Sequence, residues 1–279
     1  MAFGRREFIG AGLGVLGAGA AAAQNKKGGQ TPSGNSTFLD SLGGGRRGAA
    51  PPIPARKGKI TKLFKSPEGY PNAMALTTDG VWLGEQKTDH AILVDWEGKL
   101  QKTVKTESKN TSGMGVGGGY IWMGANSNGH NGIFQTDMNS KTVTHREIPL
   151  GGGGTHGVLY QDGKLWIAAL RLRGILKVDA KTWEPEFMIP YAVPRAHGVA
   201  WDNGAIWMVT GDDQGAGLIK YDAATGRTLE TVRFDDRFPD PHGLALRDGV
   251  LYTCDAGIHP GWPDDISTAT GYVCRIEIT

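Results

Sequence analysis

The chain has 279 residues, of which 44 are glycine and only 21% are charged, and its formal net charge is +2 at pH 7. A chain of this length can bury a substantial hydrophobic core as one domain. The small net charge, without a basic stripe of interleaved aromatic residues, excludes a nucleic-acid-binding surface of the usual kind. The composition therefore predicts a globular protein without a nucleic-acid partner.

The first 23 residues have the features of an export signal. The segment GRREFIG places Arg5 and Arg6 ahead of a weakly apolar Gly/Ala/Leu run that ends in three alanines before Gln24. This pattern resembles a twin-arginine signal with its small-residue cleavage site. The apolar run of about 14 residues is too short to span a bilayer stably. We therefore expect a periplasmic or secreted protein that uses the twin-arginine export machinery and has no stable membrane span after processing.

Residues 24–57 form the next segment. They are rich in glycine, serine, proline and basic residues and contain few apolar side chains. So few apolar groups cannot offset the entropy that is lost when a chain becomes ordered. The sequence therefore predicts a flexible linker over 24–57 and a folded domain over 58–279.

A motif that ends in an aromatic anchor recurs five times in this domain. The anchors lie 40 to 45 residues apart, which is the period of a propeller blade. Within each unit, short apolar runs alternate with turn signals such as DNG and AATG, a pattern typical of four antiparallel strands. No stretch after Lys57 has a sustained helical period, so no long helix is expected there. The anchors are Trp82, Trp122, Trp166, Trp207 and Tyr252.

The two ends of the domain indicate how the ring closes. The last unit ends after its third strand, GYVCRIEI, whereas KITKLF at 59–64 matches the fourth strand of the other units. An N-terminal strand that completes the last blade would remove exposed sheet edges. The predicted fold class is therefore all-β, a β-propeller of five four-stranded blades. A six-bladed ring with a degenerate blade in 31–57 is the alternative, and the composition of that segment argues against it.

Three of the five repeats carry a histidine at the same position, ten residues before the anchor. This position, the slot, holds His156, His197 and His242 in the last three repeats, and Asn72 and Ser112 in the first two. The first strand of a propeller blade lines the axis, so the slot side chains should meet at the mouth of the central channel.

Three neutral imidazoles at one level suit a divalent metal such as zinc, iron or copper. Asn72 and Ser112 are weak ligands, so a coordination position would stay open. The alternatives are histidines that make only structural hydrogen bonds, or a metal-free acid/base cluster.

Other side chains are candidates for the same mouth. Glu85 and Asp255 stand three residues after the anchors of the first and last repeats, which are neighbours in a closed ring. Either carboxylate is a candidate general base or metal ligand, with a solvated loop residue as the alternative. Arg171 and Arg195 are candidates to bind a substrate carboxylate, although exposed arginines are often only solvated. His259, in the long last loop, is a further candidate.

The two cysteines, Cys254 and Cys274, fall in the second and third strands of the last repeat. These strands should be neighbours, so a disulfide is one possibility in an oxidising compartment. Two small apolar core residues are the other.

The motif PHG(L/I)A, followed by DG, an aromatic anchor and an acid, resembles the blades of the streptogramin (virginiamycin B) lyase family. The segment GVWLGEQ at 80–86 is similar to that family's strand ending in glutamate. The resemblance covers residues 57–279 and implies a propeller. Gluconolactonase-like propellers are similar and bind a divalent metal through Asn or Asp at the slot. The lyase domain of peptide-amidating enzymes places three zinc-binding histidines comparably.

The chain also departs from these families. Their propellers have six or seven blades, and Asp255 and His259 match the lyase pattern of glutamate and histidine only loosely. The export signal, the slot histidines and the resemblance together predict an exported metal-dependent lyase that acts on a small polar or anionic substrate. The alternatives are a lactone or ester hydrolase using metal-bound water, and a non-enzymatic propeller that binds a ligand or metal.

Overall fold

The computed structural model describes residues 54–212, 215–234, 241–256 and 271–279. The predicted export signal (1–23), nearly all of the predicted linker and His259 lie outside the described residues. In the described part of the chain, no helix is long and apolar enough to cross a membrane. The helical structure found there is one 3-10 turn, Pro149–Gly151, as the absence of a helical period predicts.

The described strands form five four-stranded blades of a propeller: the first three are separate sheets, and the fourth and fifth are joined through β1 into one eight-stranded sheet. The first three blades are β2 (Pro71–Thr77), β3 (Gly80–Glu85), β4 (His90–Val94) and β5 (Leu100–Lys105); β6 (Thr111–Gly117), β7 (Tyr120–Ala125), β8 (Gly132–Asp137) and β9 (Thr142–Arg146); and β10 (Thr155–Gln161), β11 (Lys164–Ala169), β12 (Gly174–Asp179) and β13 (Pro185–Pro190). The fourth is β14 (Arg195–Asp202), β15 (Ala205–Asp212), β16 (Gly215–Asp222) and β17 (Thr228–Phe234). The fifth is β18 (Pro241–Arg247), β19 (Val250–Asp255), β20 (Tyr272–Ile278) and β1 (Ala55–Lys65).

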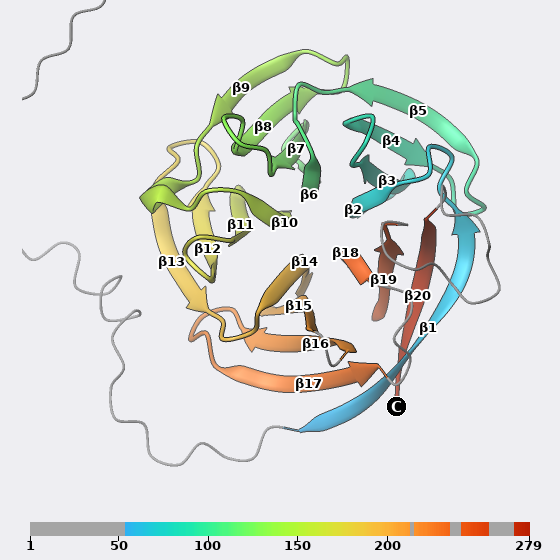
Figure 1. Cartoon of the computed structure of the whole chain (residues 1–279), viewed down its shortest axis with the longest axis vertical. Coiled ribbons are helices and arrows are strands. Elements are labelled where there is room, and N and C mark those ends of the chain that lie inside the picture. The colour runs from blue at the N-terminus through green and yellow to red at the C-terminus, as the bar shows by residue number, and fades with distance from the viewer. Residues whose placement is uncertain (1–53, 213–214, 235–240, 257–270) are drawn as a thin grey trace, which may run out of the picture. The chain divides into compact units, whose positions relative to one another are not determined.

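The blades stand around one axis, with the first strand of each repeat innermost (Figure 1). The innermost strands are β2, β6, β10, β14 and β18, and the outermost are β5, β9, β13, β17 and β1. This arrangement confirms the predicted all-β propeller and its five blades. The innermost strands of all five repeats therefore meet at the centre.

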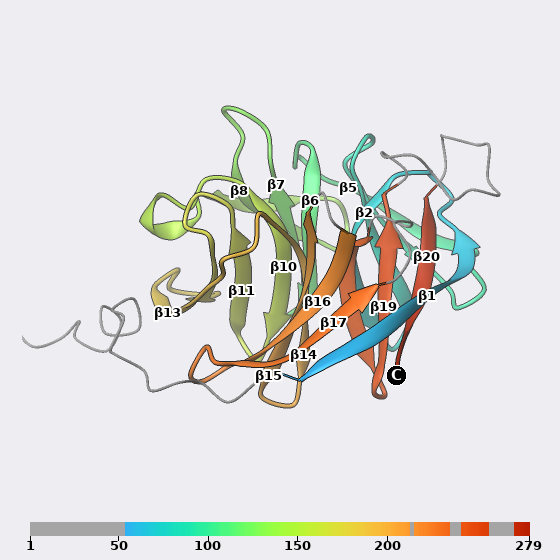
Figure 2. The same ribbon diagram turned by 60° about the horizontal axis from the view of Figure 1, so that its bottom comes forward.

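Strand β1 closes the ring by pairing with two blades. Its second half pairs antiparallel with β20, which completes the fifth blade as predicted, and Ala55–Gly58 pairs parallel with β17 of the fourth blade. Figure 2 shows β1 crossing between these blades. Gly58 lies at the crossing, where a Cβ atom would come within 2.6 Å of the Phe234 ring. The strand begins at Ala55, three residues before the expected domain boundary at 58, because of this additional parallel pairing.

Each blade buries both of its faces, so the core consists of five clusters, one between each pair of neighbouring blades. Strand β15 shows how the sequence achieves this. Ile206 and Met208 pack against the third blade, whereas Trp207 and Val209 alternate with them and pack against the fifth. Because side chains of a strand point alternately to opposite faces, a strand between two blades must be apolar at every position. The anchoring tryptophans belong to these clusters.

The same alternation keeps the two cysteines apart. Cys254 pairs with Val273 and faces the first blade, whereas Cys274 pairs with Thr253 and faces the fourth blade. Both are free thiols, and burial raises the pKa of both. The possible disulfide is therefore not formed, because the thiols lie on opposite faces of one sheet. The alternative, two small core residues, describes them correctly.

Candidate functional site

A β-bulge marks the slot in all five blades. In the third blade Thr155 pairs with Ala169 and Val158 with Ile167, so His156 and Gly157 together stand opposite the single residue Ala168. The pairing of the innermost strand shifts by one residue at the slot of every other blade as well. A bulge breaks the alternation of side chains and re-aims the bulged residue. The side chain of the slot residue therefore does not pack into the blade interfaces that its neighbours fill.

The three slot histidines are in contact with one another. The ring centroids of His156 and His197 lie 4.8 Å apart with planes 3° from parallel, so the rings are stacked. Those of His197 and His242 lie 4.4 Å apart with planes inclined by 58°. His197 and His242 are buried, and His156 is partly so. Three consecutive blades thus bring three imidazoles into one cluster.

Asn72 and Ser112 continue this cluster on the first two blades. Both are buried, and the Asn72 amide Nδ2 donates to Ser112 Oγ at 3.1 Å and to the carbonyl of Thr111 at 3.1 Å. The other amide atom, Asn72 Oδ1, is buried without a hydrogen-bond partner among the described residues. An unsatisfied buried acceptor of this kind destabilises a fold by about 1–3 kcal/mol.

His156 has the most fully defined surroundings of the three. Asn126, just after β7, donates from its amide Nδ2 to His156 Nε2 at 2.8 Å, which assigns the proton of the neutral ring to Nδ1. The pKa of His156 is lowered to about 4, mainly by burial and also by the neighbouring His242 and Arg195, while the carbonyl of Ala196 opposes this shift. The ring is therefore neutral at pH 7. Its buried Nδ1 has no partner within hydrogen-bonding geometry among the described residues.

The stacked rings decide how these residues can hold a metal. The lone pair of an imidazole nitrogen lies in the ring plane, so one ion bound by two histidines must lie in both planes. The inclined planes of His197 and His242 can meet at one ion, whereas the parallel planes of His156 and His197 cannot. Within the described ranges, no three His, Cys, Asp or Glu side chains are grouped as a metal site. His156 must therefore rotate before all three histidines can bind one ion.

Glu85 lies at the end of β3, where it is held by the loop between β1 and β2. The Ser66 hydroxyl donates to one carboxylate oxygen, and the Tyr70 backbone N–H donates to the other at 2.7 Å. Burial raises the pKa of Glu85, and these two hydrogen bonds oppose the rise. Both oxygens thus bind the loop that leads into Asn72.

Asp255 lies at the corresponding end of β19 and is buried. It pairs with Pro241, next to His242, just as Glu85 pairs with Pro71, next to Asn72. Both carboxylates raise the pKa of Cys254 electrostatically, after the larger effect of burial. The two acids thus flank one blade interface at the slot end, one strand further from the axis than the slot residues.

The two candidate arginines lie in different surroundings. Arg195 begins β14 two residues before His197, and its charge acts on His156. Arg171 is exposed in the turn after β11, where its Nη1 makes a long contact of 3.5 Å with the carbonyl of Gly151. Arg171 lines a separate cavity on the second and third blades. Only Arg195 is thereby shown to interact with the histidine cluster.

Glycines close the channel directly behind the slot. A Cβ atom on Gly198 would lie 2.3 Å from the Leu244 backbone nitrogen and 2.6 Å from the carbonyl oxygen of His242. A Cβ on Gly157 would likewise lie 2.4 Å from the carbonyl oxygen of His197. The constricted space here amounts to about 10 Å³, enough for about one water molecule. Gly113 and Gly243 line this constriction, the waist, in the second and fifth blades.

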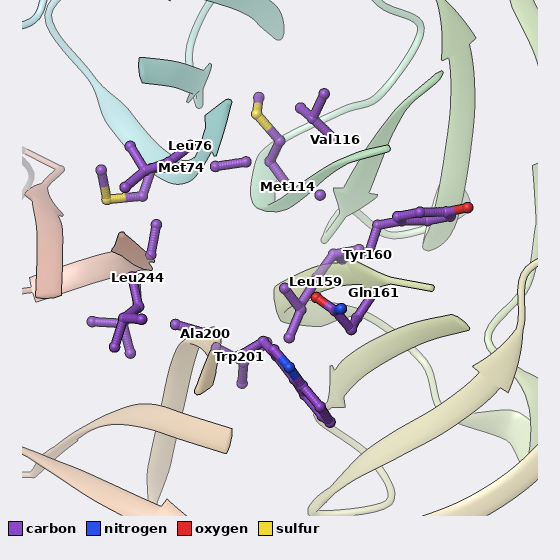
Figure 3. Close-up of a pocket in the computed structure, with 16 residues that line it drawn as sticks. Met74, Leu76, Met114, Val116, Leu159, Tyr160, Gln161, Ala200, Trp201 and Leu244 are labelled. Atoms are coloured by element: carbon purple, nitrogen blue, oxygen red, sulfur yellow. The ribbon is translucent and has the colours of Figure 1, made fainter. Parts of the chain in front are cut away.

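Beyond the waist the channel widens into a cavity of about 220 Å³. Figure 3 shows apolar side chains from different innermost strands around it, among them Met74, Met114 and Leu244. The waist has room for no more than about one water molecule, so a substrate would have to reach the histidines from the slot end.

Comparisons with known proteins support the fold. No protein-family model matches the sequence, and no curated protein matches it. Glutaminyl cyclase from Myxococcus xanthus has a similar structure, with a TM-score of 0.60 at 11% identity over 82% of this chain and 100% of that one. A nidogen/laminin complex has a TM-score of 0.51 at 14% identity over 68% of this chain and 73% of that one. These similarities concern the fold alone.

Virginiamycin B lyase from Staphylococcus aureus is also among the similar structures. Its TM-score is 0.48 at 15% identity, and the match covers 77% of this chain and 68% of that one. The propeller that the streptogramin-lyase-like motifs imply is the fold that the described strands adopt.

Proposed function

We propose that the slot cluster is the reaction centre of an exported enzyme, a metal-dependent lyase that acts on a small polar or anionic molecule. The observation that carries the proposal is the contact of three imidazoles, from three consecutive blades, at one end of a channel that is closed behind them. A fold similar to that of a glutaminyl cyclase is compatible with an enzyme and leaves the reaction open.

The energetics of the slot favour a functional role. Asn72 Oδ1 is a buried polar atom without a hydrogen-bond partner among the described residues, and the buried His156 Nδ1 has only the Ala196 carbonyl nearby, outside hydrogen-bonding geometry. Each unsatisfied atom lowers stability by about 1–3 kcal/mol. Small residues at the slot would avoid this loss of stability. Larger side chains are not needed there to close the channel, because the glycines behind the slot already close it. A ligand that forms hydrogen bonds or metal bonds with these atoms would recover the lost stability, which supports a binding role for the slot.

The chemistry of the cluster follows from its protonation states. His156 is neutral at pH 7 because its pKa is lowered to about 4, and Asn126 holds its Nε2 at 2.8 Å. Its Nδ1–H can donate to a substrate oxygen, and after rotation the ring can accept a proton. Arg195 places positive charge beside the cluster, which favours an anionic substrate.

The residues that would hold a divalent metal are His197, His242 and a rotated His156, with Asn72 Oδ1 as a further oxygen ligand. The metal would supply Lewis-acid polarisation of a substrate oxygen. Arg5 and Arg6 in the export motif support a periplasmic or secreted location.

The test is the metal content of the full-length protein after export and purification without chelator. We expect near-stoichiometric metal in the parent and little in His197→Ala or His242→Ala. His130→Ala is the matched control, because it removes an exposed histidine outside the cluster. Circular dichroism establishes that each variant is folded.

Three outcomes contradict the proposal in different parts. Metal that is retained in both slot variants shows that the histidines do not bind it. A metal-replete protein that turns over no substrate in lyase and lactonase screens, but binds a ligand through the slot, is a binding propeller. Activity on lactones or esters alone would assign the hydrolase instead.

A further inference from the structure

A second polar cavity, of about 250 Å³, lies on the second and third blades. It is built from the β7–β8 loop, strand β9, the glycine-rich segment before β10 and the turn after β11. The side chains and glycines that matter here are Asn131, His145, Glu147, Gly151, Gly153 and Arg171. The proposed reaction centre does not use this cavity.

Opposite charges line this cavity without neutralising each other. Arg171 and Glu147 form no ion pair with one another or with any other residue in the described part of the chain. Among the described residues the guanidinium makes one contact, at 3.5 Å with the carbonyl of Gly151. Glu147 is held through its backbone carbonyl, which accepts from Trp183 Nε1 at 2.8 Å. Both charged groups are therefore available to a ligand.

Asn131 lines this cavity and carries an unsatisfied acceptor. Its Oδ1 is buried without a hydrogen-bond partner among the described residues. Its backbone carbonyl accepts from His145 Nε2 at 3.1 Å, and the His145 ring stacks on Phe134 with centroids 4.1 Å apart. The packed histidine thus fixes the backbone that carries the unsatisfied amide oxygen.

The glycine-rich segment keeps one wall free of side chains. Gly151 and Gly153 have φ values of 71° and 73°, a left-handed conformation that favours glycine. A Cβ on Gly153 would lie in ordinary van der Waals contact with Arg171, 3.4 Å from its Cβ and 3.5 Å from its Nε, so a larger side chain there would take up the space beside the guanidinium. The bare backbone leaves the space beside the guanidinium to a ligand.

The cavity adjoins the slot cluster. Gly154, next to Gly153, packs so closely that a Cβ on it would lie 2.3 Å from Asn126 Oδ1 and 3.2 Å from Asn131 Oδ1. Asn126 in turn binds His156. Gly154 and Asn126 thus lie between this cavity and His156.

We propose that this cavity binds a small zwitterion, a free α-amino acid, with its carboxylate on Arg171 and its ammonium group on Glu147 and Asn131 Oδ1. A plain anion would meet the carboxylate of Glu147, and a plain cation would meet the guanidinium of Arg171. A molecule that carries both charges is complementary to both groups. Charge-assisted hydrogen bonds at each end provide the specificity.

The test is isothermal titration calorimetry of the full-length protein with the twenty proteinogenic L-amino acids. We expect one or more to bind. The N-acetyl and the C-terminal amide derivatives of the best ligand each remove one charge, and each should bind at least about tenfold more weakly. Arg171→Gln and Glu147→Gln should weaken binding of the amino acid by a similar factor.

Arg173→Gln is the matched control. Arg173 lies in the same turn, but its Nη2 donates to the carbonyls of Ala192 and Val193 instead of lining the cavity. It should leave the affinity unchanged. The affected side chains are exposed, so circular dichroism should show intact folds.

Three results would overturn the proposal: no heat of binding with any amino acid at about 10 mM, equal affinity for the N-acetyl or amide derivative, or Arg173→Gln weakening binding as much as Arg171→Gln. Binding is measured without turnover, so a failure of the proposed lyase activity leaves this result unaffected.

Discussion

The two ends of the central channel are built from the same five strands and differ in almost every property. At the slot end the side chains are polar and vary from blade to blade. The side chain two residues further along each strand is apolar and buried in every blade. The slot residues are Asn72, Ser112, His156, His197 and His242, and the apolar set is Met74, Met114, Val158, Val199 and Leu244. The β-bulge separates the two sets. On the apolar side of the bulge the side chains must fill the blade interfaces. On the slot side they do not have this packing role, so polar residues can stand there.

The largest effect is expected at the glycine waist between the two ends. Gly198→Ala should lower the free energy of unfolding by more than about 4 kcal/mol, because the new Cβ meets the β18 backbone at 2.3–2.7 Å and the backbone of a closed ring cannot retreat. Urea unfolding of the soluble fraction measures this. Gly249→Ala, with no atom within 4 Å of its Cβ, is the control and should lose only about 1–2 kcal/mol through its positive φ. Equal losses would show that the waist is not tightly packed.

The apolar end should respond to loss of volume. Leu244→Ala removes a side chain that is 2% exposed and should lower the free energy of unfolding by about 3 kcal/mol. Its effect should be the same at pH 7 and pH 5, because no titrating group of the slot is altered. Urea titrations at both pH values measure this. A loss that grows at low pH would mean that the two ends are coupled.

The slot end should make stability depend on pH. The unfolded His156 binds a proton near its ordinary pKa of about 6.5, whereas the folded ring binds one only near 4. The stabilisation is complete above pH 6.5 and is lost as pH falls towards 4, by up to about 3 kcal/mol. His156→Gln should remove this part of the pH dependence in urea titrations from pH 7 to pH 4. A parent and variant with parallel profiles would contradict the buried neutral histidine.

The smallest effect is expected at Asn72. Asn72→Ala loses the hydrogen bonds to Thr111 and Ser112 but also removes the unsatisfied Oδ1. These effects oppose each other, so the free energy of unfolding should change by no more than about 1 kcal/mol. Thermal unfolding measures it, with metal content determined in parallel. A loss of more than about 3 kcal/mol would indicate that the slot is polar for structural reasons.

Much of the fold could be predicted because it repeats. The spacing of the anchors from Trp82 to Tyr252 and the strand at 59–64 together predicted the five blades and their closure. The register of the motif also predicted that the slot residues share one level. Repetition makes such inferences secure, because an error in one copy is corrected by the others.

Features that do not repeat could not be predicted in this way. The bonding of both Glu85 oxygens to Ser66 and Tyr70 depends on one loop conformation, and the second cavity combines Asn131 and Glu147, which have no counterpart in the motif. The cysteines share neighbouring strands, but a one-residue difference in register puts their thiols on opposite faces.

The sequence by itself determined the propeller, its number of blades and the residues at the slot, because apolar periodicity and turn residues act locally and recur. Only the tertiary structure decided how the slot side chains meet. The stacking of His156 on His197, the bond from Asn126 and the glycine waist all depend on atoms that approach across blade interfaces, and their distances follow from the closed ring of five blades rather than from any one repeat.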